Sequence, residues 1–275
     1  MKKILSALLL ASMLVAALAS CATGDDTTTT TTAPAATTTT TKKPVQTPPP
    51  QQTTEPTPES EVPKTPGAGL EELIAGKTLV TVDPTQFGVV DFDSWNEETE
   101  NIMGLFDGVK TEQDWYYNAD GTIKDGADIE NANGGGPGKC GGHLAWEEPG
   151  AYFYFALEEA ATIKAYVIWT GNDNSKYMDR NPVEWKLYGT NDAEAYAAAI
   201  AGGVTEPVKA VDYPFDETKW TVLDDVYDGA VEQGNFLANG YEIDAANQQS
   251  FKYYCWFLGY TEGGSFQACE LELYK

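Results

Sequence analysis

Short segments rich in aromatic and β-branched residues recur from residue 151 to the C-terminus, and they limit the possible folds more than any other feature. In CELELY (269–274), Leu271 and Leu273 alternate with Glu270, Glu272 and Tyr274. A period of two is typical of an antiparallel strand with one face on a core and one in water. The segments rich in aromatic and β-branched residues are AYFYFAL (151–157), TIKAYVIWT (162–170), PVEWKLYGT (182–190), KWTVL (219–223), FKYYCWFLGY (251–260) and CELELY.

Helical signals are few. LEELIAGK after Gly69 and DAEAYAAAIAGG from Asp192 are short candidates, and Asp192 is available as the N-cap of the second, with a glycine pair at its end. Strands separated by turn signals, with little helix, indicate an all-β protein. We therefore expect residues 69–275 to form one jelly-roll β-sandwich domain with short helices in insertions.

The N-terminal segment is typical of an exported protein. Residues 1–20 read as a signal peptide, with Lys2 and Lys3 before an apolar run. The residues before Cys21 resemble a bacterial lipoprotein box, which implies cleavage before Cys21 and acylation of this residue. Two or more acyl chains anchor a protein stably. We expect lipid anchoring to the outer face of the bacterial cell membrane; the alternative is an ordinary cleaved leader with an incidental cysteine.

Residues 21–68 are rich in threonine and proline and have almost nothing apolar to bury. Such a segment cannot offset the entropy of ordering its backbone, so it should be a disordered, extended spacer. The formal net charge of the chain is −25. So acidic a surface argues against nucleic acid and anionic lipid headgroups as partners, whereas divalent cations are a natural counterpart.

The cysteines of the sequence do not decide whether the domain contains a disulfide. With Cys21 assigned to lipid, Cys140, Cys255 and Cys269 allow at most one disulfide, and their spacing does not choose the pair. There is no CxxC motif or Cys/His cluster, so a zinc site is not expected.

Four stretches of the domain resemble the F5/8 type C, or discoidin-like, family, which includes the family 32 carbohydrate-binding modules. They are LFDG (105–108), KCGG (139–142), TGNDNSKYMDRNPVEWKLYGTND (170–192) and KYYCWFLGYTEGGSFQACELELY (252–274). The resemblance extends from about Ile102 to Tyr274 in the order of the family and implies a galactose-binding-like jelly roll. Two insertions, 111–138 and 193–218, depart from the pattern.

The resemblance also implies a structural calcium ion at the edge of the sandwich. Its ligands would be Asp107 and Glu270, with loop carbonyls and Thr111. Calcium prefers oxygen ligands in irregular geometry, which a loop and a strand start can supply. The alternative is that Asp107 is a turn residue and Glu270 a solvated strand carboxylate.

Family members bind sugars through loops at one end of the sandwich, where aromatic faces and planar polar groups meet the sugar ring. The corresponding candidates here are His143, Trp146, Asn172, Asp173, Tyr177, Arg180, Tyr260 and Phe266. His143 and Trp146 have plausible roles in the loop and in packing instead. Arg180, the only arginine of the chain, could grip a ligand or bridge the carboxylates of its own loop; we favour the second role.

No catalytic motif stands in a suitable context. GPGKCG (136–141) fits GxGxxG but lacks a strand before it and a helix after it. The segment 173–184 resembles a calcium-binding EF loop, but Met178 stands where glycine is required. We expect a non-catalytic surface module that binds a glycan or glycoconjugate; the alternatives are a structural or protein-adhesion domain and, third, a glycoside-processing enzyme.

Overall fold

The computed structural model describes residues 64, 66–67, 69–136, 138–144, 150–201 and 215–275. The expected leader, Cys21, residues 21–63 of the expected linker and Trp146 lie outside these residues. The strands are β1 (Val82–Val90), β2 (Phe92–Ser94), β3 (Cys140–Leu144), β4 (Ala151–Thr162), β5 (Ala165–Trp169), β6 (Pro182–Thr190), β7 (Thr221–Val226), β8 (Ala238–Glu242), β9 (Ser250–Thr261), β10 (Ser265–Ala268) and β11 (Glu270–Tyr274). The short helices are α1 (Leu70–Ile74), α2 (Glu112–Tyr116), α3 (Ala193–Ala201) and the 3-10 helices η1 (Ile102–Leu105), η2 (Met178–Arg180) and η4 (Glu217–Lys219).

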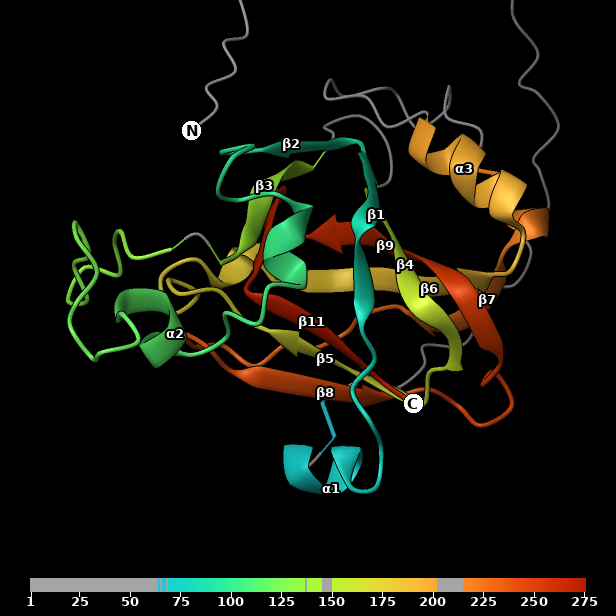
Figure 1. The fold of residues 1–275 in the computed structure, drawn as a ribbon, viewed down its shortest axis with the longest axis horizontal. Coiled ribbons are helices and arrows are strands. Elements are labelled where there is room, and N and C mark those ends of the chain that lie inside the picture. Colours follow the sequence, from blue (N-terminus) through green and yellow to red (C-terminus); the bar gives the residue numbers. More distant parts are fainter. Residues whose placement is uncertain (1–63, 65, 68, 137, 145–149, 202–214) are drawn as a thin grey trace, which may run out of the picture. The chain divides into compact units, whose positions relative to one another are not determined.

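The strands form three antiparallel sheets (Figure 1). The largest has five strands in the order β1-β4-β9-β6-β7, and a three-stranded sheet has the order β11-β5-β8. A smaller sheet, β10-β3-β2, carries the KCGG motif. The helices lie between strands rather than within a helical layer, so the predicted class, an antiparallel β-sandwich with short helices in insertions, is confirmed.

The main core lies between the large sheet and the β11-β5-β8 sheet. Phe153 and Phe155 of β4 and Trp256 of β9 face Ile168 of β5 and Leu271 of β11, and all five side chains are buried. Each large aromatic side chain removes on the order of 150–250 Å² from water. Burial of this aromatic layer therefore supplies much of the driving force for closing the two sheets.

The outer face of β11 differs from the sequence-based expectation. Glu270, Glu272 and Tyr274 were expected in water, yet their exposed fractions are 7%, 3% and 8%. The reason is that β11 is covered on this side: Lys110 pairs with Glu272, and the Trp169 indole donates to the same carboxylate at 2.9 Å. A period of two identifies a strand but does not show what covers its second face.

Several expected elements agree closely with the structure. The segment 182–190 is β6, and Asp192 caps α3, because its Oδ1 accepts from the amides of Glu194 and Ala195. The glycine pair expected to end α3 lies outside the described residues. The strands β1, β2, β3, β8 and β10 were not expected from the sequence, and these strands are short or interrupted by glycine, proline and polar residues.

Contacts with the sandwich begin before Gly69. Lys64 pairs with Asp224 of β7 and donates to the carbonyl of Glu242 at 3.2 Å. The amide of Gly67 donates to the carbonyl of Gly240 at 2.9 Å. The end of the expected linker is thus attached to the β8 region of the domain.

Cys140, Cys255 and Cys269 are buried free thiols. None of these three cysteines pairs with another, so the disulfide that the sequence left open is not formed among them. In the part of the chain that the structure describes, no helix combines the length and apolar character needed to cross a membrane.

Candidate functional site

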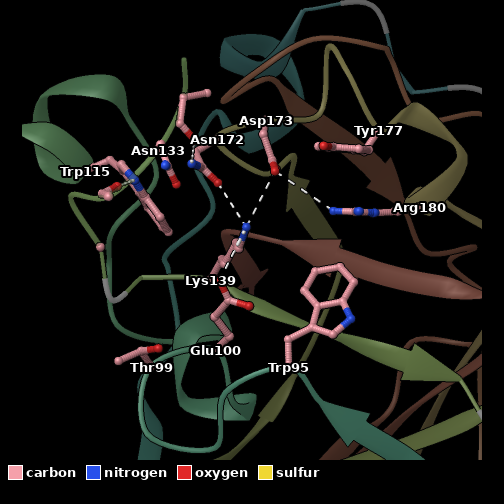
Figure 2. A pocket seen from close by; sticks show the side chains of 13 residues that line it. Trp95, Thr99, Glu100, Trp115, Asn133, Lys139, Asn172, Asp173, Tyr177 and Arg180 are labelled. Atoms are coloured by element: carbon pink, nitrogen blue, oxygen red, sulfur yellow. Dashed lines mark hydrogen bonds and ion pairs between the residues drawn. The ribbon is translucent and has the colours of Figure 1, made fainter. Parts of the chain in front are cut away.

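A polar pocket of about 420 Å³ opens beside the small β10-β3-β2 sheet. Figure 2 shows side chains from separate loops pointing into it. They are Trp95, Thr99, Glu100, Trp115, Asn133, Lys139, Asn172, Asp173, Tyr177 and Arg180, with Ala132, Gly134 and Gly136 completing the wall. The volume lies in the range of about 300–1,000 Å³ that is common for ligand sites.

Trp95 forms one wall and is held from two sides. Its indole Nε1 donates to Nε2 of His143 at 3.1 Å, and Nδ1 of His143 lies 2.9 Å from Oγ of Ser265. An indole can only donate, so neutral His143 carries its proton on Nδ1 and donates it to Ser265. A Cβ at Gly141 would lie 2.7 Å from the ring of Trp95, so the ring needs glycine there.

Arg180 lies between two rings at the edge of the pocket (Figure 2). Its Cζ is 3.8 Å from the ring centroid of Tyr177 and 4.5 Å from that of Trp95. Its Nη1 lies 3.9 Å from Asp173 and donates to Oε1 of Gln267 at 3.3 Å. A guanidinium stacked in this way fixes both rings as well as the loop.

Lys139 forms the floor of the pocket, and its side chain is 7% exposed. Its ammonium donates to Oδ1 of Asn172 at 3.2 Å and lies 3.6 Å from carboxylate oxygens of both Glu100 and Asp173. It also lies 5.8 Å from the ring centroid of Trp95. A buried ammonium is tolerated because these charges and dipoles surround it.

Asn172 connects this floor to the insertion 111–138. While its Oδ1 accepts from Lys139, its Nδ2 donates to the carbonyl of Ala132 at 3.1 Å. Trp115 of α2 reaches the pocket from the same insertion, and its Nε1 donates to the carbonyl of Gly134 at 2.9 Å. The insertion therefore builds one wall of the pocket and leaves it open.

The structure brings together four of the predicted site residues and separates others from them. Asn172, Asp173, Tyr177 and Arg180 line the pocket. His143 lies in β3 rather than in a loop, but it is exposed and contacts Trp95.

Tyr260 and Phe266 do not line the pocket. Phe266 was expected in a loop but lies in β10 with 0% exposure, packed against Phe153 and Trp256 in the core. Its side chain cannot meet a ligand without opening the sandwich. Tyr260 is 49% exposed near the end of β9, opposite Glu184 of β6.

Sequence reasoning missed Trp95, Glu100, Trp115 and Lys139. Trp95 and Glu100 precede the stretch that resembles the family, and Trp115 lies inside an insertion that breaks its pattern. Lys139 stood in the quoted KCGG motif, where a lysine usually indicates a solvated residue. The glycines close to Lys139 in the sequence were the available signal, since a Cβ at Gly141 would lie 2.7 Å from the ring of Trp95.

A second cleft, of about 350 Å³, contains two of the three residues expected to bind calcium. Asp107 and Glu270 both line it. Oε2 of Glu270 accepts from the amide of Gly108 at 2.9 Å, and Oδ1 of Asp107 accepts from that of Val109 at 2.9 Å. Burial, followed by the nearby Asp107 and Glu272 carboxylates, raises the pKa of Glu270 to about 8.

Of the three residues expected to bind calcium, two have side chains that suit the ion and one does not. Asp107 and Glu270 fit, because two carboxylates that share a cleft can bind a cation between them. Thr111 does not fit through its side chain: its hydroxyl donates to Asp114 at 2.6 Å as part of the capping box of α2. Within the described residues, no group of three or more His, Cys, Asp and Glu side chains could hold a metal ion, so loop carbonyls and water would have to complete the shell.

Comparison with known proteins gives distant structural likeness. No protein-family model matches the sequence, and no curated protein matches it. The family 32 carbohydrate-binding module of C. perfringens NanJ, solved with galactose, has a TM-score of 0.35 at 12% identity, covering 72% of this chain and all of that one (100%).

Two further solved structures show the same level of likeness. The CBM32-1 and CBM32-2 domains of Clostridium perfringens ZmpB have a TM-score of 0.41 at 12% identity, covering 79% of this chain and 42% of that one. An F5/8 type C domain from Bacteroides fragilis has a TM-score of 0.39 at 10% identity, covering 73% and 97%. These are the domain classes that the sequence motifs resemble. Similarity at this level says nothing about the ligand.

Proposed function

We propose that residues 69–275 form a carbohydrate-binding module whose ligand site is the pocket around Lys139. The observation that carries this proposal is the convergence of ring side chains and fixed hydrogen-bonding groups around one open volume of about 420 Å³. Trp95, Trp115 and Tyr177 supply the rings. Sugars combine an apolar ring face with a rim of hydroxyls, and such a site matches both.

The proposed module has no catalytic activity of its own. Glycoside hydrolysis usually requires a carboxyl group that donates a proton to the leaving oxygen. The pocket carboxylates, Glu100 and Asp173, both pair with Lys139. Both carboxylates therefore already have a cationic partner within the pocket, and this arrangement favours binding over catalysis.

We also propose that the chain is exported, acylated at Cys21 and held at the outer face of the membrane, with the residues between Cys21 and Lys64 as a spacer. The support is the leader pattern and the threonine- and proline-rich composition of the sequence. A calcium ion between Asp107 and Glu270 is a further part of the proposal, with a structural role at the edge of the sandwich.

Glycan arrays and affinity electrophoresis test the binding function. Tyr177→Ala removes a ring that is 42% exposed at the pocket, and it should weaken binding by about tenfold. Tyr227→Ala is the matched control, since Tyr227 is 75% exposed and does not line the pocket. Absence of binding to a broad glycan set by the folded protein would reject the proposal, and capture of an envelope or surface protein would then favour an adhesion domain.

A further inference from the structure

The ammonium of Lys139 has more unused bonding capacity than its burial would suggest. An ammonium has three donors. Within the described part of the chain, one hydrogen bond uses them, to Asn172 at 3.2 Å, although the side chain is 7% exposed. The carboxylate oxygens of Glu100 and Asp173 lie at 3.6 Å, beyond hydrogen-bonding distance. Donors of Lys139 therefore remain for a group that enters the pocket.

An unused acceptor lies beside this donor. Oδ1 of Asp173 is buried and has no hydrogen-bond partner among the described residues. It lies 3.6 Å from Nζ of Lys139, so one oxygen atom can sit about 2.8 Å from both. That atom must accept from the ammonium and donate to the carboxylate. A hydroxyl does both, whereas a carboxylate can only accept and an ammonium can only donate.

The charges of the pocket point to the same ligand class. Lys139 and Arg180 are balanced by Glu100 and Asp173, so the pocket is formally neutral, within a chain whose formal net charge is −25. An anionic sugar that approached Lys139 would also meet both carboxylates at close range. A cationic amino sugar would meet the ammonium itself. Like charges at such distances cost free energy that an uncharged ligand avoids.

We infer that Lys139 and Asp173 together bind a hydroxyl of an uncharged sugar, and that they discriminate against uronic acids and free amino sugars. This inference rests on the proposed function and specifies its ligand class. In the free protein a water molecule can bridge the same two atoms, and the ligand hydroxyl replaces it with the same donor and acceptor pattern. Lys139 is thus a ligand-binding residue, while Asn172 holds its ammonium in place.

Binding is measured by NMR titration and calorimetry at pH 7 with matched probes. The probes are D-glucose, D-galactose and N-acetyl-D-galactosamine, each next to its uronic acid or free amino counterpart. The neutral forms should bind at least about tenfold more tightly than the charged forms, with little dependence on salt. If a uronic acid binds as tightly as its neutral form, or binds more weakly as salt is added, the inference is wrong but the proposed function stands. If no sugar binds the folded protein, both fail.

Two variants separate this role from a structural one. Asp173→Asn gives the pocket a formal charge of one positive unit and should shift the preference from neutral sugar towards uronic acid by about tenfold. An unchanged preference would overturn the inference. Lys139→Met should weaken the binding of neutral sugar by at least about tenfold. Lys186→Met is its control, since Lys186 lies on β6 and pairs with Asp225 at 2.9 Å, outside the pocket. If Lys139→Met does not fold, the preference of Asp173→Asn for neutral sugar or uronic acid still tests the inference.

Discussion

The guanidinium of Arg180 lies over the indole of Trp95, with Cζ 4.5 Å from the ring centroid. Tyr177 covers the other side of the guanidinium (Figure 2). The only arginine of the chain therefore does not project freely into the pocket: it joins two of its walls. Its carboxylate partner is Asp173, which lies in the same loop as Arg180.

Replacing Arg180 tests its structural role. Arg180→Ala should lower the free energy of unfolding by about 1–3 kcal/mol, because Gln267 and Asp173 lose a partner and two rings lose their packing. Arg180→Lys keeps the charge without the planar stack and should give a smaller loss. Urea denaturation measures both values. If Arg180→Ala abolishes sugar binding at unchanged stability, Arg180 instead acts mainly on the ligand.

Gly141 sets the position of Trp95. In Gly141→Ala the new methyl group would lie 2.7 Å from Cζ3 of Trp95, so the indole must move. We expect weaker sugar binding and a change in tryptophan fluorescence. Gly67→Ala serves as the control, since its nearest neighbour would be the carbonyl oxygen of Gly240 at 3.7 Å. Equal binding by both variants would show that the position of Trp95 does not matter for the ligand.

The sequence predicts the sandwich because alternation is clear in β6 and β11 and because aromatic residues are dense in β4 and β9. It does not predict β3 or β10, because Gly141 and Gly142 of β3 and Gln267 of β10 carry no period-two signal and pair through long-range contacts. The pocket is predictable only in part for the same reason. The polar residues of the loop after β5 can be recognised in the sequence itself. Lys139, in contrast, belongs to the site because folding places it near Glu100 and Asp173, and no local sequence pattern predicts that proximity.

Chelation tests the proposed calcium ion. If calcium lies between Asp107 and Glu270, EDTA should lower the melting temperature and added Ca²⁺ should restore it, because a ligand that binds only the folded state stabilises it. Glu270→Gln should remove this response. Glu98→Gln, at an exposed position outside the cleft, should keep it. Identical melting curves of the parent protein in EDTA and in Ca²⁺ would count against the site.

Thiol labelling tests the state of the cysteines. Cys140, Cys255 and Cys269 are buried, and burial raises the pKa of each thiol, so each is both inaccessible and protonated at neutral pH. We expect no reaction with Ellman's reagent in the folded domain and reaction of all three thiols in denaturant. Reaction of a single thiol after unfolding without reductant would instead reveal a disulfide.

Lys64 tests where the folded unit begins. Its ammonium pairs with Asp224, whose side chain is 11% exposed and accepts from the hydroxyl of Tyr166 at 2.6 Å. The indole of Trp185 in turn donates to that hydroxyl at 2.8 Å. Loss of the ammonium leaves a largely buried carboxylate in this chain of hydrogen bonds without its cation.

We therefore expect Lys64→Met to lower the free energy of unfolding by about 1–3 kcal/mol in urea denaturation. The control is Lys164→Met: Lys164 is exposed, and replacement of such a surface residue usually changes stability by less than about 0.5 kcal/mol. A protein that begins at Gly69 should show the same loss as Lys64→Met or a larger one, because it also lacks the hydrogen bond from Gly67 to Gly240. If the protein that begins at Gly69 is as stable as the parent protein, the domain starts at Gly69 and the contacts of Lys64 contribute nothing to the free energy of unfolding.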